Sequence, residues 1–352
     1  MKAWMVVEAN KPLQQFEVPT PVPTGSEVLI EVTHCGVCHS DLHFWKGEYN
    51  LGGGVILKLA DRGVKLPSAP GHEVAGRVVA MGPDAKGVSI GDMRVVFPWL
   101  GCGECEDCRN EDDNLCLQPK AIGVVRNGGF GSHVLVPHPR FLADPGNVDP
   151  ALAATYACSG ITVYSAVNKI MPLNPDKPVV LIGAGGLGLM GIAMLKAFGH
   201  RNIVSVDLDP VKRDAALAEG ATQTVDGAAE GLTQRILDTC GPAAAVLDFV
   251  GNDATAKSSY DALAKGGKLV IVGVAGGQIT LSLAGLIFRA HTVQGSLVGN
   301  PKDLRAVLEL ANSGKLKPTP IHLCSHDHAN EALLDLKAGK VTGRTVLVRD
   351  PA

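Results

Sequence analysis

The chain has 352 residues, with 32 Lys and Arg against 35 Asp and Glu, which gives a net charge of −3. That balance provides no basic surface for nucleic acid or an anionic membrane, so neither is expected as a partner. Hydrophobic residues make up 46% and charged residues 19%, which excludes a disordered chain and predicts a large buried core. The length predicts two domains.

The first 150 residues are rich in Pro and Gly and contain short β-branched runs, a pattern typical of a β-rich domain. The composition changes near Asp149-Pro150, where an Ala-rich helical stretch over 151–167 begins. Strands in the first part are predicted over 28–32, 74–79, 94–97 and 133–136.

Beyond residue 178, apolar strands alternate with amphipathic helices, which predicts a doubly wound parallel sheet. The apolar stretch 179–198 contains clustered glycines and Lys196, so it is interpreted as strand, turn and helix and not as a membrane span. Helices over 302–312 and 327–338 and a last strand over 345–348 are expected to return to the first domain. The strands of the parallel sheet are predicted over 179–182, 203–206, 245–248 and 269–272.

A glycine-rich loop joins the first of these strands to its helix, in the order Gly183-Ala184-Gly185-Gly186-Leu187-Gly188. Its glycines allow a tight turn and let backbone N–H groups approach a pyrophosphate at the helix N-terminus. Asp207 closes the next strand about 20 residues downstream, where a carboxylate binds ribose hydroxyls and repels a 2′-phosphate. The pattern therefore predicts NAD rather than NADP. Lys212 either contacts the ribose or is a solvated helix residue.

Four of the nine cysteines, Cys102, Cys105, Cys108 and Cys116, fall within fifteen residues and are separated by turn-forming residues. This spacing predicts a tetrahedral zinc site with four thiolate ligands. Four protein ligands leave no open position, so the site is expected to be structural. Such cysteine usage, and the charged Glu8 early in the chain, favour a cytoplasmic protein without a secretory signal.

Cys38, His72 and Cys158 offer a second set of metal ligands from three separate segments. A set of two Cys and one His leaves a fourth tetrahedral position for water or substrate. Taken alone, Cys158 is more typical of a small buried hydrophobe and His72 of a core histidine. The remaining cysteines, Cys35, Cys240 and Cys324, are interpreted as ordinary thiols.

Several motifs together carry a resemblance over essentially the whole chain. They are Cys35-Gly36-Val37-Cys38-His39-Ser40-Asp41, Gly71-His72-Glu73, the four-cysteine segment, the glycine-rich loop and Gly343-Arg344-Thr345-Val346-Leu347. The chain resembles the zinc-dependent medium-chain alcohol dehydrogenases, in their yeast-like tetrameric branch. The resemblance implies a GroES-like β-rich catalytic domain (1–152), a Rossmann NAD-binding domain (153–293) and a return to the catalytic domain (294–352). The active site is expected in the cleft between them.

The resemblance also implies roles for individual residues. Cys38, His72 and Cys158 would hold a catalytic zinc, with Asp41 orienting the ring of His72. Ser40 would take the alcohol proton, His43 would pass it to solvent, and Glu73 would lie behind the zinc as a transient ligand. Cofactor contacts are implied for His39, Gly183, Gly185, Gly186, Leu187, Gly188, Asp207, Lys212, Val272, Val274 and Arg344.

The substrate pocket is the least determined part of the resemblance. Trp45 and Trp99 occupy positions similar to those at which tryptophans in the yeast-like branch restrict the pocket to small primary alcohols. Alternatively, either tryptophan is a core residue. The Gly-rich segment 49–66 is longer than in yeast-like members and is expected to reshape the pocket mouth. The short connection between Cys116 and Cys158 also resembles the yeast-like branch, which implies a homotetramer, with a homodimer as the alternative.

The predicted function is an NAD- and zinc-dependent alcohol dehydrogenase with two zinc ions per chain. It would oxidise primary alcohols, with aromatic and secondary alcohols left open, and catalyse the reverse reduction. The close alternative is a polyol-, threonine- or formaldehyde-type zinc dehydrogenase with the same fold. A non-catalytic nucleotide-binding protein or a zinc-free quinone reductase is disfavoured, because the metal ligands and the proton relay are both present.

Overall fold

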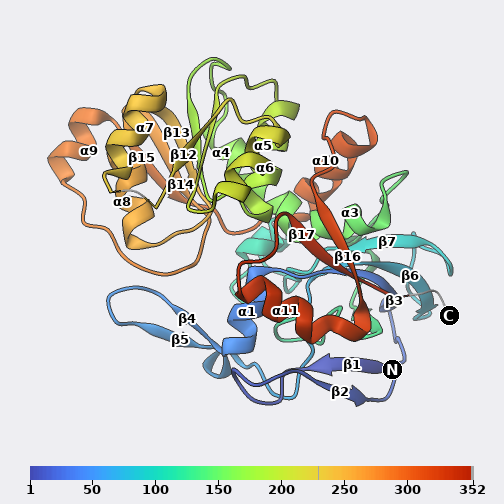
Figure 1. Ribbon diagram of the computed structural model, residues 1–352. Helices are drawn as coiled ribbons and strands as arrows, with labels where there is room; N and C mark the ends of the chain where they lie inside the picture. The colour runs from blue at the N-terminus through green and yellow to red at the C-terminus, as the bar shows by residue number, and fades with distance from the viewer. Residues whose placement is uncertain (229, 350–352) are drawn as a thin grey trace.

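A computed structural model describes residues 1–228 and 230–349, and its β-rich part is built on a seven-stranded sheet (Figure 1). The central strands β3 and β6 are antiparallel, and they begin and end within a few residues of the predicted strands. Two small hairpins lie outside this sheet: β1 (Lys2–Met5) with β2 (Gln14–Glu17), and β4 (Glu48–Asn50) with β5 (Ile56–Lys58). The seven strands are β3 (Val28–Gly36), β6 (Glu73–Met81), β7 (Met93–Val96), β8 (His133–Val136), β9 (Leu142–Ala143), β16 (Ile321–Ser325) and β17 (Arg344–Val348).

The predicted parallel sheet is confirmed as a six-stranded, all-parallel sheet with the strand order β12-β11-β10-β13-β14-β15. Every residue of β10 is buried, as expected for a strand with helices over both faces of its sheet (Figure 1). The strands are β10 (Val179–Ile182), β11 (Ile203–Asp207), β12 (Gln223–Asp226), β13 (Ala243–Asp248), β14 (Leu263–Ile271) and β15 (Thr292–Gly295). The helices are α5 (Gly186–Ala197), α6 (Pro210–Glu219), α7 (Leu232–Cys240), α8 (Asp253–Asp261) and α9 (Leu283–Arg289).

The helix predicted over 151–167 is in fact three consecutive segments. They are α3 (Pro150–Thr155), a π-helical turn (Tyr156–Gly160) and α4 (Ile161–Ile170). The Asp149 carboxylate caps the N-terminus of α3 by accepting a hydrogen bond from the backbone N–H of Ala151, at 2.9 Å. The π-helical turn has no signature in the Ala-rich pattern, and such turns often occur at functional sites. Here it carries Cys158.

The C-terminal residues return to the first sheet, as expected. β17 pairs antiparallel with β3, with Val346 opposite Gly36. The helix predicted over 327–338 is a 3-10 turn (His326–His328) followed by α11 (Ala329–Lys337), and the preceding helix is α10 (Pro301–Asn312). The largest buried cluster includes residues from both sheets. Among the described residues, no helix is both long and apolar enough to cross a membrane.

Candidate active site

Three sulfur and nitrogen ligands converge from distant parts of the chain. Cys38 is the N-cap of α1 (His39–Lys46), His72 directly precedes β6, and Cys158 lies in the π-helical turn. Their ligand atoms all lie within 4.8 Å of one another. Cys38, His72 and Cys158 are 7%, 1% and 5% exposed, so the cluster is buried.

The ring of His72 is oriented by the carboxylate of Asp41, whose Oδ1 lies 3.2 Å from Nδ1. Asp41 is itself fixed, because it accepts hydrogen bonds from the backbone N–H groups of Cys38 and Gly71, at 2.8 and 3.0 Å. The other ring nitrogen, Nε2, is buried and has no hydrogen-bond partner among the described residues. A buried nitrogen without a partner beside two thiols fits a zinc ion, which the Cys-His-Cys set binds while keeping one position open.

The pKa values of the two thiols in this cluster are shifted in opposite directions. A hydrogen bond with Cys158 is the main cause that lowers the pKa of Cys38 well below its ordinary value, and the Arg344 guanidinium adds to it. The same bond, followed by burial, raises the pKa of Cys158. Cys38 is thus the more acidic thiol of the pair, and the thiolate is the form that binds a metal.

Glu73 lies behind the cluster as a fully buried carboxyl group. Its Oε1 is 3.3 Å from the Arg344 guanidinium and accepts a hydrogen bond from the backbone of Ser159 at 3.2 Å. Burial raises the pKa of Glu73 to about 8, although the charge of Arg344 opposes this. Gly36 leaves room for the carboxyl, since a Cβ there would lie 1.9 Å from Glu73 Oε2.

Ser40 and His43 lie one turn apart on α1, so both side chains project from the same face of the helix. Burial, followed by the charge of Lys46, lowers the pKa of His43, which makes the neutral imidazole its form at pH 7. The imidazole stacks on the ring of Tyr49, with 4.6 Å between ring centroids and 19° between planes. The sequence analysis assigned no role to Tyr49. It identified only the segment 49–66, to which Tyr49 belongs, as unusually long.

The glycine-rich loop occurs where it was predicted, between β10 and α5. Gly188 is required by close packing, because a Cβ there would lie 1.9 Å from the carbonyl oxygen of Gly183. Asp207 ends β11, and its Oδ2 accepts a hydrogen bond from the backbone of Ala184 at 2.7 Å. The carboxylate is thus fixed against the loop that would hold the cofactor. Gly185 is the N-cap of α5, and Gly186 and Leu187 begin the helix.

Three more predicted cofactor residues gather near this loop from different elements. Burial is the main cause that lowers the pKa of His39, and the positive charges of Arg344 and Lys212 lower it further. Arg344 also lies against Gly186, since a Cβ on that glycine would be 3.3 Å from the guanidinium carbon. The Arg344 guanidinium beside the N-terminus of α5 is a suitable partner for a pyrophosphate.

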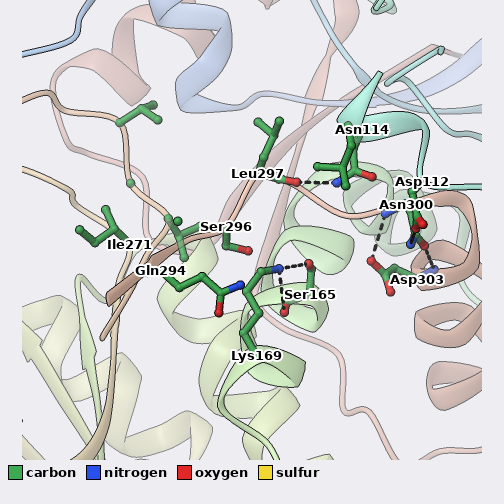
Figure 2. A pocket seen from close by; sticks show the side chains of 15 residues that line it. Asp112, Asn114, Ser165, Lys169, Ile271, Gln294, Ser296, Leu297, Asn300 and Asp303 are labelled. Atoms are coloured by element: carbon green, nitrogen blue, oxygen red, sulfur yellow. Dashed lines mark hydrogen bonds between the residues drawn. The ribbon is translucent and has the colours of Figure 1, made fainter. Parts of the chain in front are cut away.

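Val272 and Val274 follow β14 and line a cavity of about 800 Å³. The segment after β15 and the four-cysteine segment also line this cavity (Figure 2). Asn114 joins these two segments by donating a hydrogen bond to the carbonyl of Leu297 at 2.9 Å. The two valines predicted to contact the cofactor therefore border open space.

The two tryptophans differ in their surroundings. The indole of Trp99 lies next to the metal-ligand cluster, 5.5 Å from the His72 ring between centroids. Trp45 is buried, donates a hydrogen bond from its indole to the carbonyl of Lys11 at 2.5 Å, and packs under the ammonium of Lys337. The structure thus places Trp99 at the cluster, whereas the pocket role of Trp45 stays a prediction.

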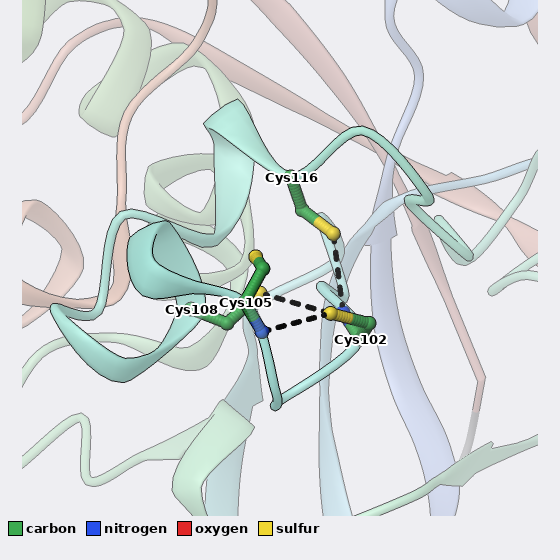
Figure 3. A group of neighbouring side chains, drawn as sticks. All are labelled: Cys102, Cys105, Cys108 and Cys116. Carbon is green, nitrogen blue, oxygen red and sulfur yellow. Dashed lines mark hydrogen bonds between the residues drawn. The ribbon is translucent and has the colours of Figure 1, made fainter.

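The four remaining ligand cysteines form a second cluster, which we call the cysteine lobe (residues 102–116; Figure 3). Their sulfur atoms also lie within 4.8 Å of one another. Backbone N–H groups of Glu104 and Cys105 point at the sulfur of Cys102, both at 3.4 Å, and lower the pKa of that thiol to about 6. A closed set of four thiols with backbone donors fits a structural zinc.

Comparison with known proteins agrees with both sites. Residues 24–145 match the alcohol dehydrogenase GroES-like domain, and residues 186–313 match the zinc-binding dehydrogenase domain. An NAD-dependent alcohol dehydrogenase of Sulfurisphaera tokodaii is 38% identical, over 99% of this chain and 100% of the relative. A D-arabinose 1-dehydrogenase (NADP(+)) of Saccharolobus solfataricus is 34% identical, over 98% and 97%. The alcohol dehydrogenase structure of Aeropyrum pernix superposes with a TM-score of 0.89 at 29% identity, covering 99% and 100%.

The chain therefore belongs to the zinc-containing medium-chain alcohol dehydrogenases. Within that family, its own residues define the kind of enzyme more closely. The Cys-His-Cys cluster, the four-cysteine lobe and an acidic residue at the end of β11 are those of an NAD-dependent zinc alcohol dehydrogenase.

Proposed function

We propose that the enzyme oxidises small primary alcohols to aldehydes with NAD⁺ and catalyses the reverse reduction. The observation that carries this choice is the position of Trp99, whose indole lies 5.5 Å from the ring of a metal ligand. A bulky side chain next to the reaction centre restricts the substrate more strongly than one at the pocket mouth. Secondary and aromatic alcohols are expected to react more slowly.

Bound zinc supplies Lewis-acid activation of the substrate oxygen, and NAD⁺ supplies the hydride acceptor. The protein's part is to hold the ligands and to move the hydroxyl proton. Ser40 accepts that proton while passing on its own, and the neutral imidazole of His43 takes it towards solvent. Asp41 keeps the ring of His72 in one orientation, and Arg344 holds Glu73 behind the ligands.

The preference for NAD rests on Asp207, whose carboxylate would repel a 2′-phosphate. Asp207→Gly removes that charge and its bond to the glycine-rich loop. We expect the ratio of kcat/KM with NAD to that with NADP to fall by about 10- to 100-fold, or roughly 1.4–2.8 kcal/mol. Equal use of both cofactors by the unaltered enzyme would contradict this role.

A homotetramer is the proposed assembly, with a homodimer as the simpler alternative. β15 is an edge strand of the parallel sheet, and α9 beside it exposes Leu283, Ile287 and Phe288 to between 74% and 77%. An open strand edge next to large apolar side chains favours contact with a second copy. Light scattering after size exclusion distinguishes a tetramer, a dimer and a monomer. No cysteine of the described residues is in a disulfide, and six of the nine belong to the two metal-ligand clusters, a usage that supports the predicted cytoplasmic location.

The experiment that tests the activity follows NADH absorbance with straight-chain, branched, benzylic and polyol alcohols, with and without a zinc chelator. We expect the highest kcat/KM for short primary alcohols and complete loss after chelation. Trp99→Ala is expected to extend activity to bulkier alcohols by about tenfold in kcat/KM, as a pocket contact of 1–3 kcal/mol predicts. An unchanged chain-length profile would contradict the pocket assignment.

A sugar or polyol substrate is the second candidate. It is favoured by the similarity over nearly the full length to a D-arabinose 1-dehydrogenase. The same panel decides between the two, because a polyol-type enzyme would prefer the polyols over ethanol and propanol.

A further inference from the structure

The unusually long segment after α1 forms a hairpin that is continuous with the helix of the proton relay. Gly47 ends α1 in the left-handed conformation, and β4 begins at the next residue. The backbone of Leu59 closes the base of the hairpin by donating a hydrogen bond to the carbonyl of Gly47 at 2.9 Å. In Figure 1 the hairpin reaches out from the catalytic domain beneath the coenzyme domain. Ser40, His43 and the hairpin thus form one connected unit.

The first strand of the hairpin contacts the relay directly. Tyr49 lies in β4, and its ring is stacked at 4.6 Å on the imidazole of His43. Burial raises the pKa of Tyr49, so its phenol stays neutral at physiological pH. A neutral aromatic ring at this distance restricts the rotation of the imidazole without supplying a proton acceptor of its own.

The tip of the hairpin lies against the other domain. A Cβ on Gly52 would lie 2.2 Å from the carbonyl oxygen of Gly277, and a Cβ on Gly276 would lie 2.4 Å from the carbonyl oxygen of Asn50. Only glycines allow the two backbones to approach this closely. The receiving loop follows Val272 and Val274, and it is anchored to its own domain by the bond from Gly276 N–H to the carbonyl of Gly251, at 3.0 Å.

We propose that Tyr49 is a positioning residue for His43, and that docking of the hairpin tip on Gly276 and Gly277 holds it in place. The proton relay is then assembled only while the catalytic and coenzyme domains are closed on each other. The inference rests on the proposed function, because it assigns His43 to proton transfer. It adds that closure of the cleft between the domains positions His43 for proton transfer.

The stack is tested by Tyr49→Ala and Tyr49→Phe in the full-length, zinc-loaded enzyme. We expect kcat for alcohol oxidation to fall about tenfold in Tyr49→Ala, less than the roughly 10²- to 10⁴-fold contributed by a positioned proton acceptor, because His43 is still present. The solvent deuterium isotope effect on kcat should rise, because proton transfer becomes slower than the other steps. Tyr49→Phe keeps the ring and should restore kcat to within about twofold. An unchanged kcat and isotope effect in Tyr49→Ala would overturn the positioning role.

The docking is tested with glycines that share one backbone conformation. Gly52 and Gly54 have φ values of 82° and 80°, but a Cβ on Gly54 meets nothing within 4 Å. Alanine therefore introduces the same backbone strain at both positions and blocks the contact only at Gly52. We expect Gly52→Ala to lower kcat about fivefold and raise the isotope effect, while Gly54→Ala matches the parent enzyme. Equal behaviour of the two variants would overturn the docking.

A second pair repeats the test from the coenzyme domain. Gly276→Ala blocks the contact with Asn50, whereas Gly266→Ala adds a Cβ at φ 77° into open space. Zinc content, NADH affinity and thermal unfolding are measured for every variant, so that a folding defect is separated from a relay defect. Chelator-sensitive oxidation by the parent with no difference between paired variants contradicts the inference alone. Absence of that oxidation in the zinc-loaded parent contradicts the proposed function and, with it, the role of His43.

Discussion

The cysteine lobe and the catalytic cluster bring their ligand atoms within the same 4.8 Å, yet they do so by opposite means. The lobe draws its four thiols from one short loop, and Cys102 is exposed to solvent. The catalytic cluster joins three buried ligands from three separate segments, with Asp41, Glu73 and Arg344 packed around them. The order of the lobe therefore depends mainly on its metal, whereas the geometry of the catalytic cluster is set by the tertiary fold.

Loss of a catalytic ligand is expected to give the largest effect on activity. Cys38→Ala leaves only two ligands at the cluster, so alcohol oxidation should fall by about 10³-fold or more, and zinc content should fall from two ions to one. The unfolding temperature should fall less than in a variant of the cysteine lobe, because packing around the other two ligands remains when the metal is lost. Activity and zinc are measured on the same sample, with Cys240→Ala as the control. Retention of two zinc ions would contradict the ligand assignment.

Loss of a lobe ligand should show the opposite pattern. Cys105→Ala leaves a loop of three thiols whose order depends on the metal. We expect stability to fall by about 3–5 kcal/mol and the unfolding temperature by roughly 4–7 °C. The rate measured at 25 °C on freshly prepared enzyme should stay within about threefold of the parent, since no reacting group is touched. An unaltered melting temperature would show that the lobe is held together without zinc.

Asp41→Asn tests whether the catalytic cluster depends on the residues packed around it. The amide can still face His72 Nδ1, but it lacks the charge that makes the imidazole a stronger ligand. A 10- to 100-fold loss of zinc affinity or of kcat/KM is expected. Competition with a chromophoric chelator measures that affinity. An affinity equal to that of the parent would mean that the ring is oriented by packing alone.

The same contrast explains which parts of the two sites could be predicted from the sequence. The cysteine lobe can be predicted from the spacing of its cysteines, because all four ligands lie in one loop. The glycine-rich loop can be predicted because its strand, turn and helix are consecutive in the sequence. Cys158 was offered as a third ligand from its residue type, but its assignment to the zinc rested on the family resemblance, since its π-helical turn leaves no local pattern. The stack of Tyr49 on His43 and the docking of Gly52 were out of reach, because each depends on how segments distant in sequence are arranged.

Two ion pairs around the lobe differ in how deeply they are buried. Asp113 is fully buried and pairs with Arg140, with 2.6 Å between Oδ1 and Nη2, whereas Glu111 and Arg305 form a pair in which both side chains are substantially exposed. Asp113→Asn should therefore destabilise the protein by about 2–4 kcal/mol, because it leaves a partly buried guanidinium without its charge partner. Glu111→Gln should cost less than about 0.5 kcal/mol, since solvent screens an exposed pair.

Urea unfolding of the two zinc-loaded variants measures this difference directly. A large loss in Glu111→Gln would mean that the lobe depends on its surface attachment to α10 and is not a device completed by its metal. A small loss in both variants, together with the loss expected for Cys105→Ala, would place nearly all of the lobe's stability in the thiol cluster itself. That outcome would make the contrast with the catalytic cluster sharper, because the cluster has its supporting charges buried on every side.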